Sequence, residues 1–218
     1  MTFNKDLPLL IFDLDGTLID SAKDIHLAIN KMLLNHGRQE VDYPTLVSHI
    51  GDGLIKLVND FFPEYHIESK ENMIKVNEFL HIYETSMVQH TYLYPKVSEF
   101  LQSYEGAKAI VTNKNIKPAL EILEHFNLHQ LSWVSVIGGD SLAEKKPSAL
   151  PLQYVMEKAG INAAHTWMIG DGRPDMLSAK AAGCFKIAVH YGYSKPEELA
   201  IYQPDHVLKT FGDLQPLI

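Results

Sequence analysis

The chain has 218 residues, 46% of them hydrophobic and 21% charged, which is the composition of an ordinary globular protein with one large domain or two smaller ones. Its formal net charge of -8 argues against a nucleic-acid-binding surface and against attachment to an anionic membrane, since both need basic patches. The chain has one cysteine, no signal-peptide-like apolar core at its N-terminus and no apolar run of bilayer length, so we expect a cytoplasmic protein without internal disulfides.

The first predicted element is the apolar run Leu9–Phe12, which leads directly into Asp13-Leu14-Asp15-Gly16-Thr17. A continuous apolar run of this length predicts a strand buried on both faces of a sheet. Burying ionised carboxylates is unfavourable unless a cation, hydrogen bonds or a proton compensate them. Asp13 and Asp15 therefore indicate a site where a metal ion meets a reacting group. The alternative is a plain polar turn, because Asp and Gly are common turn formers.

Residues 18–92 show helical patterns without obvious strands. Ser21 and Asp24 fit a capping box for a first helix that stops near Gly37, and Pro44 fits the start of a second helix. Two more apolar stripes keep helical spacing, and their simplest interpretation is core packing: Leu54, Leu57, Val58 and Phe61, then Met73, Val76, Phe79, Leu80, Tyr83 and Met87. We expect an all-helical insert directly after the first strand.

In the second half of the chain, short apolar runs alternate with helical patterns. The runs cover residues 109–111, 134–137, 166–169 and 187–189, and one of the helical stripes consists of Ile116, Leu120, Leu123 and Phe126. This alternation predicts βαβ units in a doubly wound (Rossmann-like) α/β core with a parallel sheet. We assign residues 1–17 and 93–218 to that core and residues 18–92 to a helical cap domain.

Polar side chains follow several of these strands, and parallel strands bring their carboxyl ends to the same edge of a sheet. The acidic ones offer oxygen ligands that suit Mg²⁺, and the others offer the hydrogen-bond donors that a phosphate needs. An acidic metal site beside a phosphate clamp indicates phosphoryl transfer, with a carboxylate as nucleophile. The acidic set is Asp13, Asp15, Asp171 and Asp175; the donor set is Thr112, Asn113 and Lys146.

In these residues the sequence resembles the haloacid dehalogenase-like superfamily, in its phosphatase branch with a helical C1-type cap. Four motifs stand in the order found in that family: Asp13 to Thr17, Val111-Thr112-Asn113, Lys145-Lys146-Pro147, and Gly170-Asp171-Gly172-Arg173-Pro174-Asp175. Within the family the chain is most similar to phosphoglycolate phosphatases, through Tyr94-Pro95, Gly138-Gly139-Asp140 and Ala181-Ala182-Gly183-Cys184.

The resemblance implies a role for each motif residue. Asp13 would attack phosphorus, and Asp15 would protonate the leaving alcohol and then activate water. Thr112 and Lys146, helped by Asn113, would bind the phosphoryl group. Mg²⁺ would be held by Asp13, Asp171 and the backbone carbonyl of Asp15, with Asp175 supporting the metal shell.

The chain departs from the family pattern at three positions. Ala149 stands where a second proline is common, Gly172 where Ser or Thr is common, and Pro174 where Asn is common. These changes leave the charged groups in place, so they bear on the geometry of the metal loop and on the rate. The presence of Asp15 sets aside the dehalogenases and phosphonate hydrolases of the family, whose motifs lack this second aspartate.

The segment His49-Ile50-Gly51-Asp52-Gly53, with Lys56 one turn later, is the feature of the insert most suggestive of substrate contact. Its glycines would let the backbone approach a substrate, with His49 or Lys56 meeting a carboxylate. The alternative is a simple turn between helices.

We therefore expect a Mg²⁺-dependent phosphatase for a small phosphorylated metabolite, with 2-phosphoglycolate as the leading candidate. The alternatives are a phosphosugar mutase of the β-phosphoglucomutase kind, a pyrophosphatase or nucleotidase, and a non-enzymatic binding module. The sequence does not distinguish a monomer from a homodimer.

Overall fold

A computed structural model describes residues 3–218, and in this part of the chain six strands form one parallel sheet in the order β5-β4-β1-β6-β7-β8. The predicted α/β class with a parallel sheet is confirmed. The strands are β1 (Leu9–Phe12), β4 (Lys108–Val111), β5 (Trp133–Ile137), β6 (Thr166–Gly170), β7 (Phe185–Val189) and β8 (His206–Leu208).

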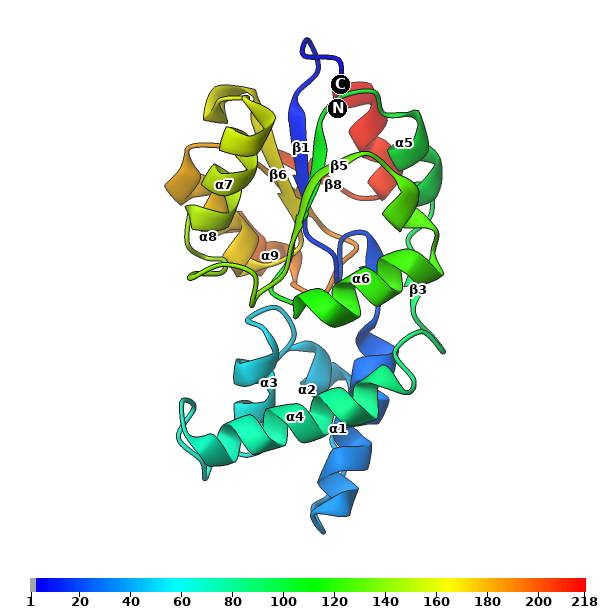
Figure 1. Ribbon diagram of the computed structural model, residues 1–218, viewed down its shortest axis with the longest axis vertical. Coiled ribbons are helices and arrows are strands. Elements are labelled where there is room, and N and C mark those ends of the chain that lie inside the picture. The colour runs from blue at the N-terminus through cyan, green and yellow to red at the C-terminus, as the bar shows by residue number, and fades with distance from the viewer. Residues whose placement is uncertain (1–2) are drawn as a thin grey trace.

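Strand β1 lies in the middle of the sheet, and all four of its side chains are buried. Leu10 and Phe12 point into one apolar core, whereas Leu9 and Ile11 point into a second core on the other face. Helices α7 (Leu150–Ala159) and α8 (Arg173–Ala182) cover the second face; α5 (Val97–Ser103), α6 (Ile116–His125) and the 3₁₀ helix η3 (Phe211–Leu217) cover the first (Figure 1). Three short elements complete this half: η1 (Leu128–Gln130), η2 (Ala163–His165) and α9 (Pro196–Ala200).

Four helices lie together beyond the carboxyl ends of the strands, at the lower end of Figure 1. They are α1 (Ala22–Asn35), α2 (Tyr43–Val47), α3 (Leu54–Phe61) and α4 (Lys70–Glu84). The long helices α1 and α4 pack against each other, and α3 packs on α4. The side chains of Asp42 and Ser69 cap α2 and α4 by accepting backbone N–H groups, which explains why these helices begin where they do.

The segment 18–92 is not free of strands, contrary to the prediction. The chain leaves and re-enters the sheet half through an antiparallel ribbon of β2 (Ile19–Asp20) and β3 (Tyr92–Leu93). Two residues per strand are too few to give an alternating pattern. Strand β8 was also missed, because two of its three residues are exposed and it carries no apolar run.

Two predicted apolar stripes are rotated relative to the observed buried faces. Leu120 of α6 is 46% exposed and Met73 of α4 is 39% exposed. Helix α6 instead buries Ala119, Ile122 and Leu123.

The predicted capping box at the start of α1 is wrong. The Ser21 side chain makes no capping bond, because its hydroxyl donates to Asp15 instead. Asp24 is 1% exposed and accepts hydrogen bonds from the N–H groups of His90 and Thr91 and from the Thr91 hydroxyl. Burial alone would raise the pKa of Asp24, but these hydrogen bonds outweigh it and hold the pKa below its ordinary value. Asp24 therefore ties α1 to the two residues directly before β3.

Replacing Asp24 by asparagine should lower the free energy of unfolding at pH 7 by about 2 kcal/mol, because hydrogen bonds to a buried charged group are lost. A pKa lowered in the folded state gives stability that is complete above the ordinary carboxyl value of 3.8. That stability is lost as the pH falls through the lower folded value. In urea titrations, the difference between the wild type and Asp24→Asn should therefore shrink below about pH 4. Asp6→Asn, at an exposed carboxylate, is the control. A difference that grows on acidification would contradict this account.

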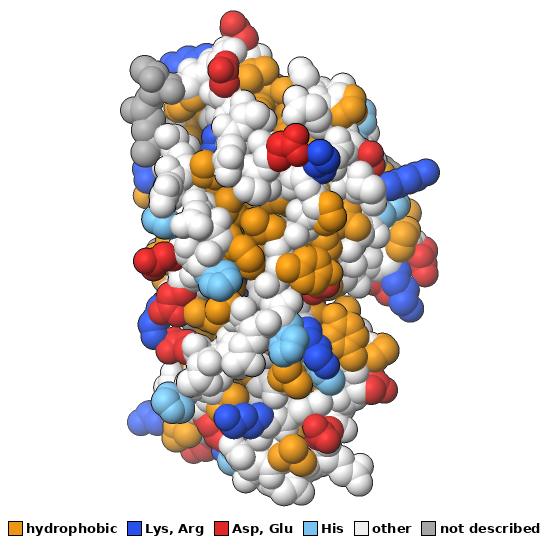
Figure 2. Space-filling model, turned by 90° about the vertical axis from the view of Figure 1, so that its right-hand side faces the viewer, with side chains coloured by type: hydrophobic (Ala, Val, Ile, Leu, Met, Phe, Trp, Pro, Cys, Tyr) orange, Lys and Arg blue, Asp and Glu red, His pale blue; other side chains and the backbone are white. Residues whose placement is uncertain are grey.

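Lysine and arginine side chains are scattered over the face turned to the viewer in Figure 2, while hydrophobic side chains gather along its middle. Within residues 3–218, every helix is too short or too polar to span a bilayer.

Candidate active site

The polar residues predicted to meet do meet, at the carboxyl ends of the central strands. Asp13 and Asp15 follow β1, Thr112 and Asn113 follow β4, and Asp171 follows β6. Strand β1 lies between β4 and β6, and this is where the chain changes its direction of travel across the sheet. Open α/β sheets form their ligand crevice at such a switch point. One pocket is lined by all five of these residues.

Three carboxylates form a tight cluster at the base of this pocket. One oxygen from each of Asp13, Asp171 and Asp175 lies within 4.8 Å of the others. Burial, then repulsion from Asp13 and Asp175, raises the pKa of Asp171 well above its ordinary value. Burial and Asp13 likewise raise the pKa of Asp175 to about 7. The negative charge of the cluster is thus only partly offset by the protein. A divalent cation with a preference for oxygen ligands, such as Mg²⁺, would supply the missing positive charge.

Lys146 is the cation already present beside this cluster. Its side chain is 1% exposed, and its ammonium lies 2.9 Å from Asp13 Oδ1 and 2.6 Å from Asp175 Oδ1. Burial would lower the pKa of Lys146, but these two carboxylates outweigh it and raise the pKa. Of the two adjacent lysines, Lys146 therefore faces the cluster, and it is the one that the sequence analysis placed in the donor set.

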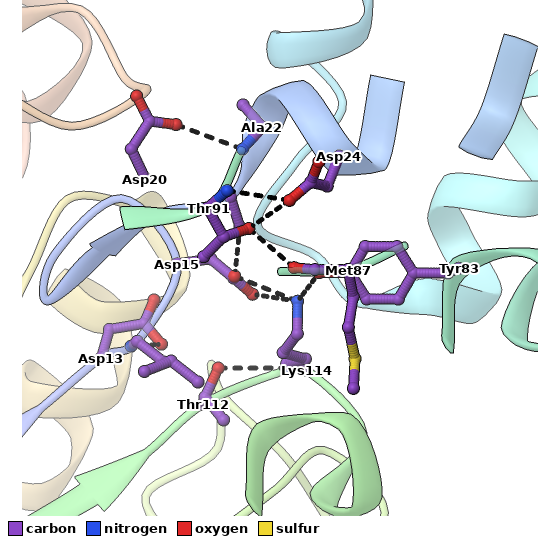
Figure 3. A network of polar contacts seen from close by, with 12 residues as sticks. Asp13, Asp15, Asp20, Ala22, Asp24, Tyr83, Met87, Thr91, Thr112 and Lys114 are labelled. Carbon is purple, nitrogen blue, oxygen red and sulfur yellow. Dashed lines mark hydrogen bonds and ion pairs between the residues drawn. The ribbon is translucent and has the colours of Figure 1, made fainter. Parts of the chain in front are cut away.

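The Asp15 carboxylate lies apart from the acidic cluster. It accepts a hydrogen bond from Ser21 Oγ, and both of its oxygens lie near Lys114 Nζ, at 3.1 and 3.2 Å (Figure 3). A metal contact through the backbone carbonyl of Asp15, as the resemblance implies, would leave this arrangement in place. The Asp15 side chain thus lies between a hydroxyl and an ammonium, and both donate to it.

Thr112 and Asn113 are both buried at the end of β4. Thr112 Oγ1 accepts a hydrogen bond from the Lys114 backbone N–H. The Asn113 amide donates to the carbonyl groups of Gly51 and Lys146, both at 3.0 Å. It therefore fixes the Lys146 loop and a loop of the helical half, and its part in binding phosphate stays a prediction.

The loop from His49 to Gly53 closes over the pocket from the helical half. His49, Gly51 and Gly53 line the pocket. Gly53 has φ +92°, and a Cβ there would lie 2.6 Å from Lys145 Nζ and 3.0 Å from the Asn113 carbonyl oxygen. Glycine thus permits this close approach between the two halves.

Lys56 does not lie among the pocket-lining residues. Its ammonium pairs with Asp60, which also accepts a hydrogen bond from His49 Nδ1 at 2.9 Å. A contact between Lys56 and a substrate carboxylate would require this pair to break.

The departures from the family pattern lie at helix starts. Gly172 is the N-cap of α8, and its N–H donates to Asp175 Oδ2 at 3.0 Å. Pro174 occupies the first turn of α8, where proline is well tolerated. Ala149 is the N-cap of α7. The Gly172 N–H holds Asp175 toward the carboxylate cluster. The three departures are therefore compatible with the position of Asp175.

Sequence reasoning missed two further residues of the site. Lys114 stands directly after Asn113, and this adjacency to a motif was the available signal. The Tyr193 N–H donates to Asp171 Oδ2 at 2.8 Å, and its hydroxyl accepts from Ser21 N at 2.8 Å. Tyr193 comes from the loop after β7, so no local pattern linked it to Asp171.

Comparison with known proteins agrees with this geometry. Residues 10–189 match the family model described as haloacid dehalogenase-like hydrolase. The chain is 37% identical over 221 residues to the phosphoglycolate phosphatase of Colwellia psychrerythraea, covering 96% of each chain. It is 35% identical to that of Chromobacterium violaceum, covering 98% of this chain and 97% of the relative. The crystal structure of a predicted phosphoglycolate phosphatase from Haemophilus somnus superimposes with a TM-score of 0.87 at 30% identity, over 98% of both chains.

Proposed function

The chain belongs to the haloacid dehalogenase-like hydrolase family, and from its site we propose that it is a Mg²⁺-dependent phosphatase of small phosphomonoesters, with 2-phosphoglycolate as the leading substrate. One observation carries this proposal: the Asp13 carboxylate, 14% exposed, is held 2.9 Å from the buried Lys146 ammonium, within a carboxylate cluster suited to a divalent cation. The full-length relatives named phosphoglycolate phosphatase support the choice of substrate.

The reaction proceeds in two steps on the residues of this chain. An oxygen of Asp13 bonds to phosphorus while the ester P–O bond breaks, and Asp15 gives its proton to the leaving alcohol. Water then bonds to phosphorus, the aspartyl-phosphate bond breaks, and Asp15 takes the water proton. Lys146 and Thr112 bind the phosphoryl oxygens, with Asn113 helping.

Asp13, Asp171 and the Asp15 carbonyl would hold Mg²⁺, with Asp175 in support. The cation would offset the repulsion between the anionic nucleophile and the phosphate. Lys146 contributes to the same end, because it is a preorganised charge in a site largely shielded from water.

The division into a core of residues 1–17 and 93–218 and a cap of residues 18–92 belongs to this proposal. The cap side of the pocket is largely apolar, with Ile25, Leu54, Leu57, Phe79 and Leu80 among the lining residues. A closed cap of this kind keeps bulk water away from the phosphoryl group. The aspartyl-phosphate then reacts with the one water molecule that Asp15 activates.

Phosphate release from a panel of small esters tests the proposed function. The panel contains phosphoglycolate, sugar phosphates, a nucleoside monophosphate and pyrophosphate, each with Mg²⁺ or with EDTA. We expect phosphoglycolate to rank first by kcat/KM, and EDTA to lower every rate by at least ~100-fold, because the acidic cluster then lacks its cation. EDTA-insensitive release would reject the metal dependence. Conversion of one sugar phosphate isomer to another without phosphate release would indicate a mutase.

A further inference from the structure

The pocket contains more carboxylates than ammonium groups, and one ammonium has no role in the reaction described above. Asp13, Asp15, Asp171 and Asp175 all line the pocket. Lys146 is committed to Asp13 and Asp175. Lys114 also lines the pocket, and its side chain is 8% exposed. It lies next to Asp15, the residue proposed to protonate the leaving alcohol.

Two hydrogen-bond donors converge beside Asp15. Lys114 Nζ lies 2.9 Å from the Tyr83 hydroxyl and donates to it. An ammonium carries three N–H groups, and Lys114 Nζ contacts two Asp15 oxygens and the Tyr83 hydroxyl, so a ligand carboxylate would take over one of the two Asp15 contacts. Within residues 3–218 the Tyr83 hydroxyl accepts from Lys114 and donates to no other group, so its hydrogen is available to a ligand. Lys114 comes from the sheet half and Tyr83 from α4, so the donor pair spans the two halves (Figure 3).

The position of this pair matches the chemistry of one substrate class. In a 2-phosphooxy carboxylate such as phosphoglycolate, the carboxylate stands one methylene group away from the ester oxygen. Asp15 has to reach that oxygen in order to protonate it. A cation paired with Asp15 is therefore close to where the carboxylate must lie. The surrounding apolar side chains strengthen an ion pair formed there.

We propose that Lys114 and Tyr83 form the receptor for the substrate carboxylate, and that they select 2-phosphooxy acids over neutral phosphomonoesters. This inference rests on the proposed phosphatase function. Other cations near the pocket are less suited to the role. Lys114 lines the pocket, whereas Lys56, paired with Asp60, and Lys145, which donates to the Asp52 carbonyl oxygen, are not among its lining residues.

The test compares phosphoglycolate with phosphoglycolamide, which has nearly the same shape but no carboxylate charge. The quantity measured is the ratio of the two kcat/KM values. Any effect of Lys114 on Asp15 changes both substrates alike and cancels in this ratio. We expect the wild type to favour the acid by at least ~10-fold, and Lys114→Gln to reduce the ratio by about 10- to 100-fold.

Two further variants complete the design. Tyr83→Phe keeps the ring stacked on Phe79 and removes only the hydroxyl, so it should reduce the ratio by roughly 3- to 10-fold even if Lys114→Gln fails to fold. Lys117→Gln is the matched control, because Lys117 of α6 also pairs with a residue of α4, Glu84, but lies outside the pocket. Its ratio should equal that of the wild type.

Equal turnover of acid and amide by the wild type would overturn the proposal. So would a fall of both substrates by the same factor in Lys114→Gln and in Tyr83→Phe. Absence of phosphate release from every ester would instead reject the proposed function on which this inference rests.

Discussion

Replacing Asp13 by asparagine is expected to reduce kcat for phosphate release by a factor on the order of 10⁴ or more, as loss of the nucleophile does in other enzymes with covalent intermediates. The amide has nearly the shape of the carboxylate but is a far weaker nucleophile toward phosphorus. Asp13 also brings one of the three oxygens of the acidic cluster, so the variant should need more Mg²⁺.

Steady-state phosphate release at saturating Mg²⁺ measures this loss. Asp6→Asn removes an exposed carboxylate that does not line the pocket and should retain the wild-type rate. An Asp13→Asn enzyme that keeps more than about a hundredth of the wild-type kcat would show that another group attacks phosphorus.

The second large effect concerns Lys146. Replacing it by methionine should lower kcat/KM by about 10²- to 10³-fold, because a preorganised charge on the phosphoryl group is lost. The change also leaves Asp13 and Asp175 without their ammonium partner in a buried site. Breaking a buried ion pair in this way costs several kcal/mol. The melting temperature without metal should fall, and added Mg²⁺ should recover part of the loss.

The neighbouring lysine provides the control. Lys145→Met removes an ammonium that contacts the Asp52 carbonyl oxygen but neither Asp13 nor Asp175. We expect its kcat/KM to stay within a few-fold of the wild type, since surface contacts of this kind contribute little. A larger loss in Lys145→Met than in Lys146→Met would reverse the assignment of the two lysines.

The sequence predicted the structural features that depend on a single segment of the chain or on the parallel arrangement of the strands. The apolar run Leu9–Phe12 is buried on both faces, and that requirement alone predicts a central parallel strand. The convergence of Asp13, Thr112 and Asp171 follows from parallel strands ending at one edge.

Local sequence patterns did not predict the contacts between segments that are far apart in the chain. Ser21 and Asp24 have the spacing of a capping box, but tertiary partners compete for both side chains: Asp15 for one, His90 and Thr91 for the other. A buried carboxylate is stabilised more by several N–H donors than by a helix end. The Lys114–Tyr83 contact likewise joins positions far apart in the chain.

Trapping of the covalent intermediate tests the central claim most directly, which is that Asp13 accepts the phosphoryl group. The wild-type enzyme is mixed with phosphoglycolate and Mg²⁺, quenched in acid within milliseconds, digested and analysed by mass spectrometry. The account predicts a phosphorylated peptide modified at Asp13, absent with EDTA and absent in Asp13→Asn. A phosphoryl group on any other residue, or turnover by Asp13→Asn at the wild-type rate, would contradict it.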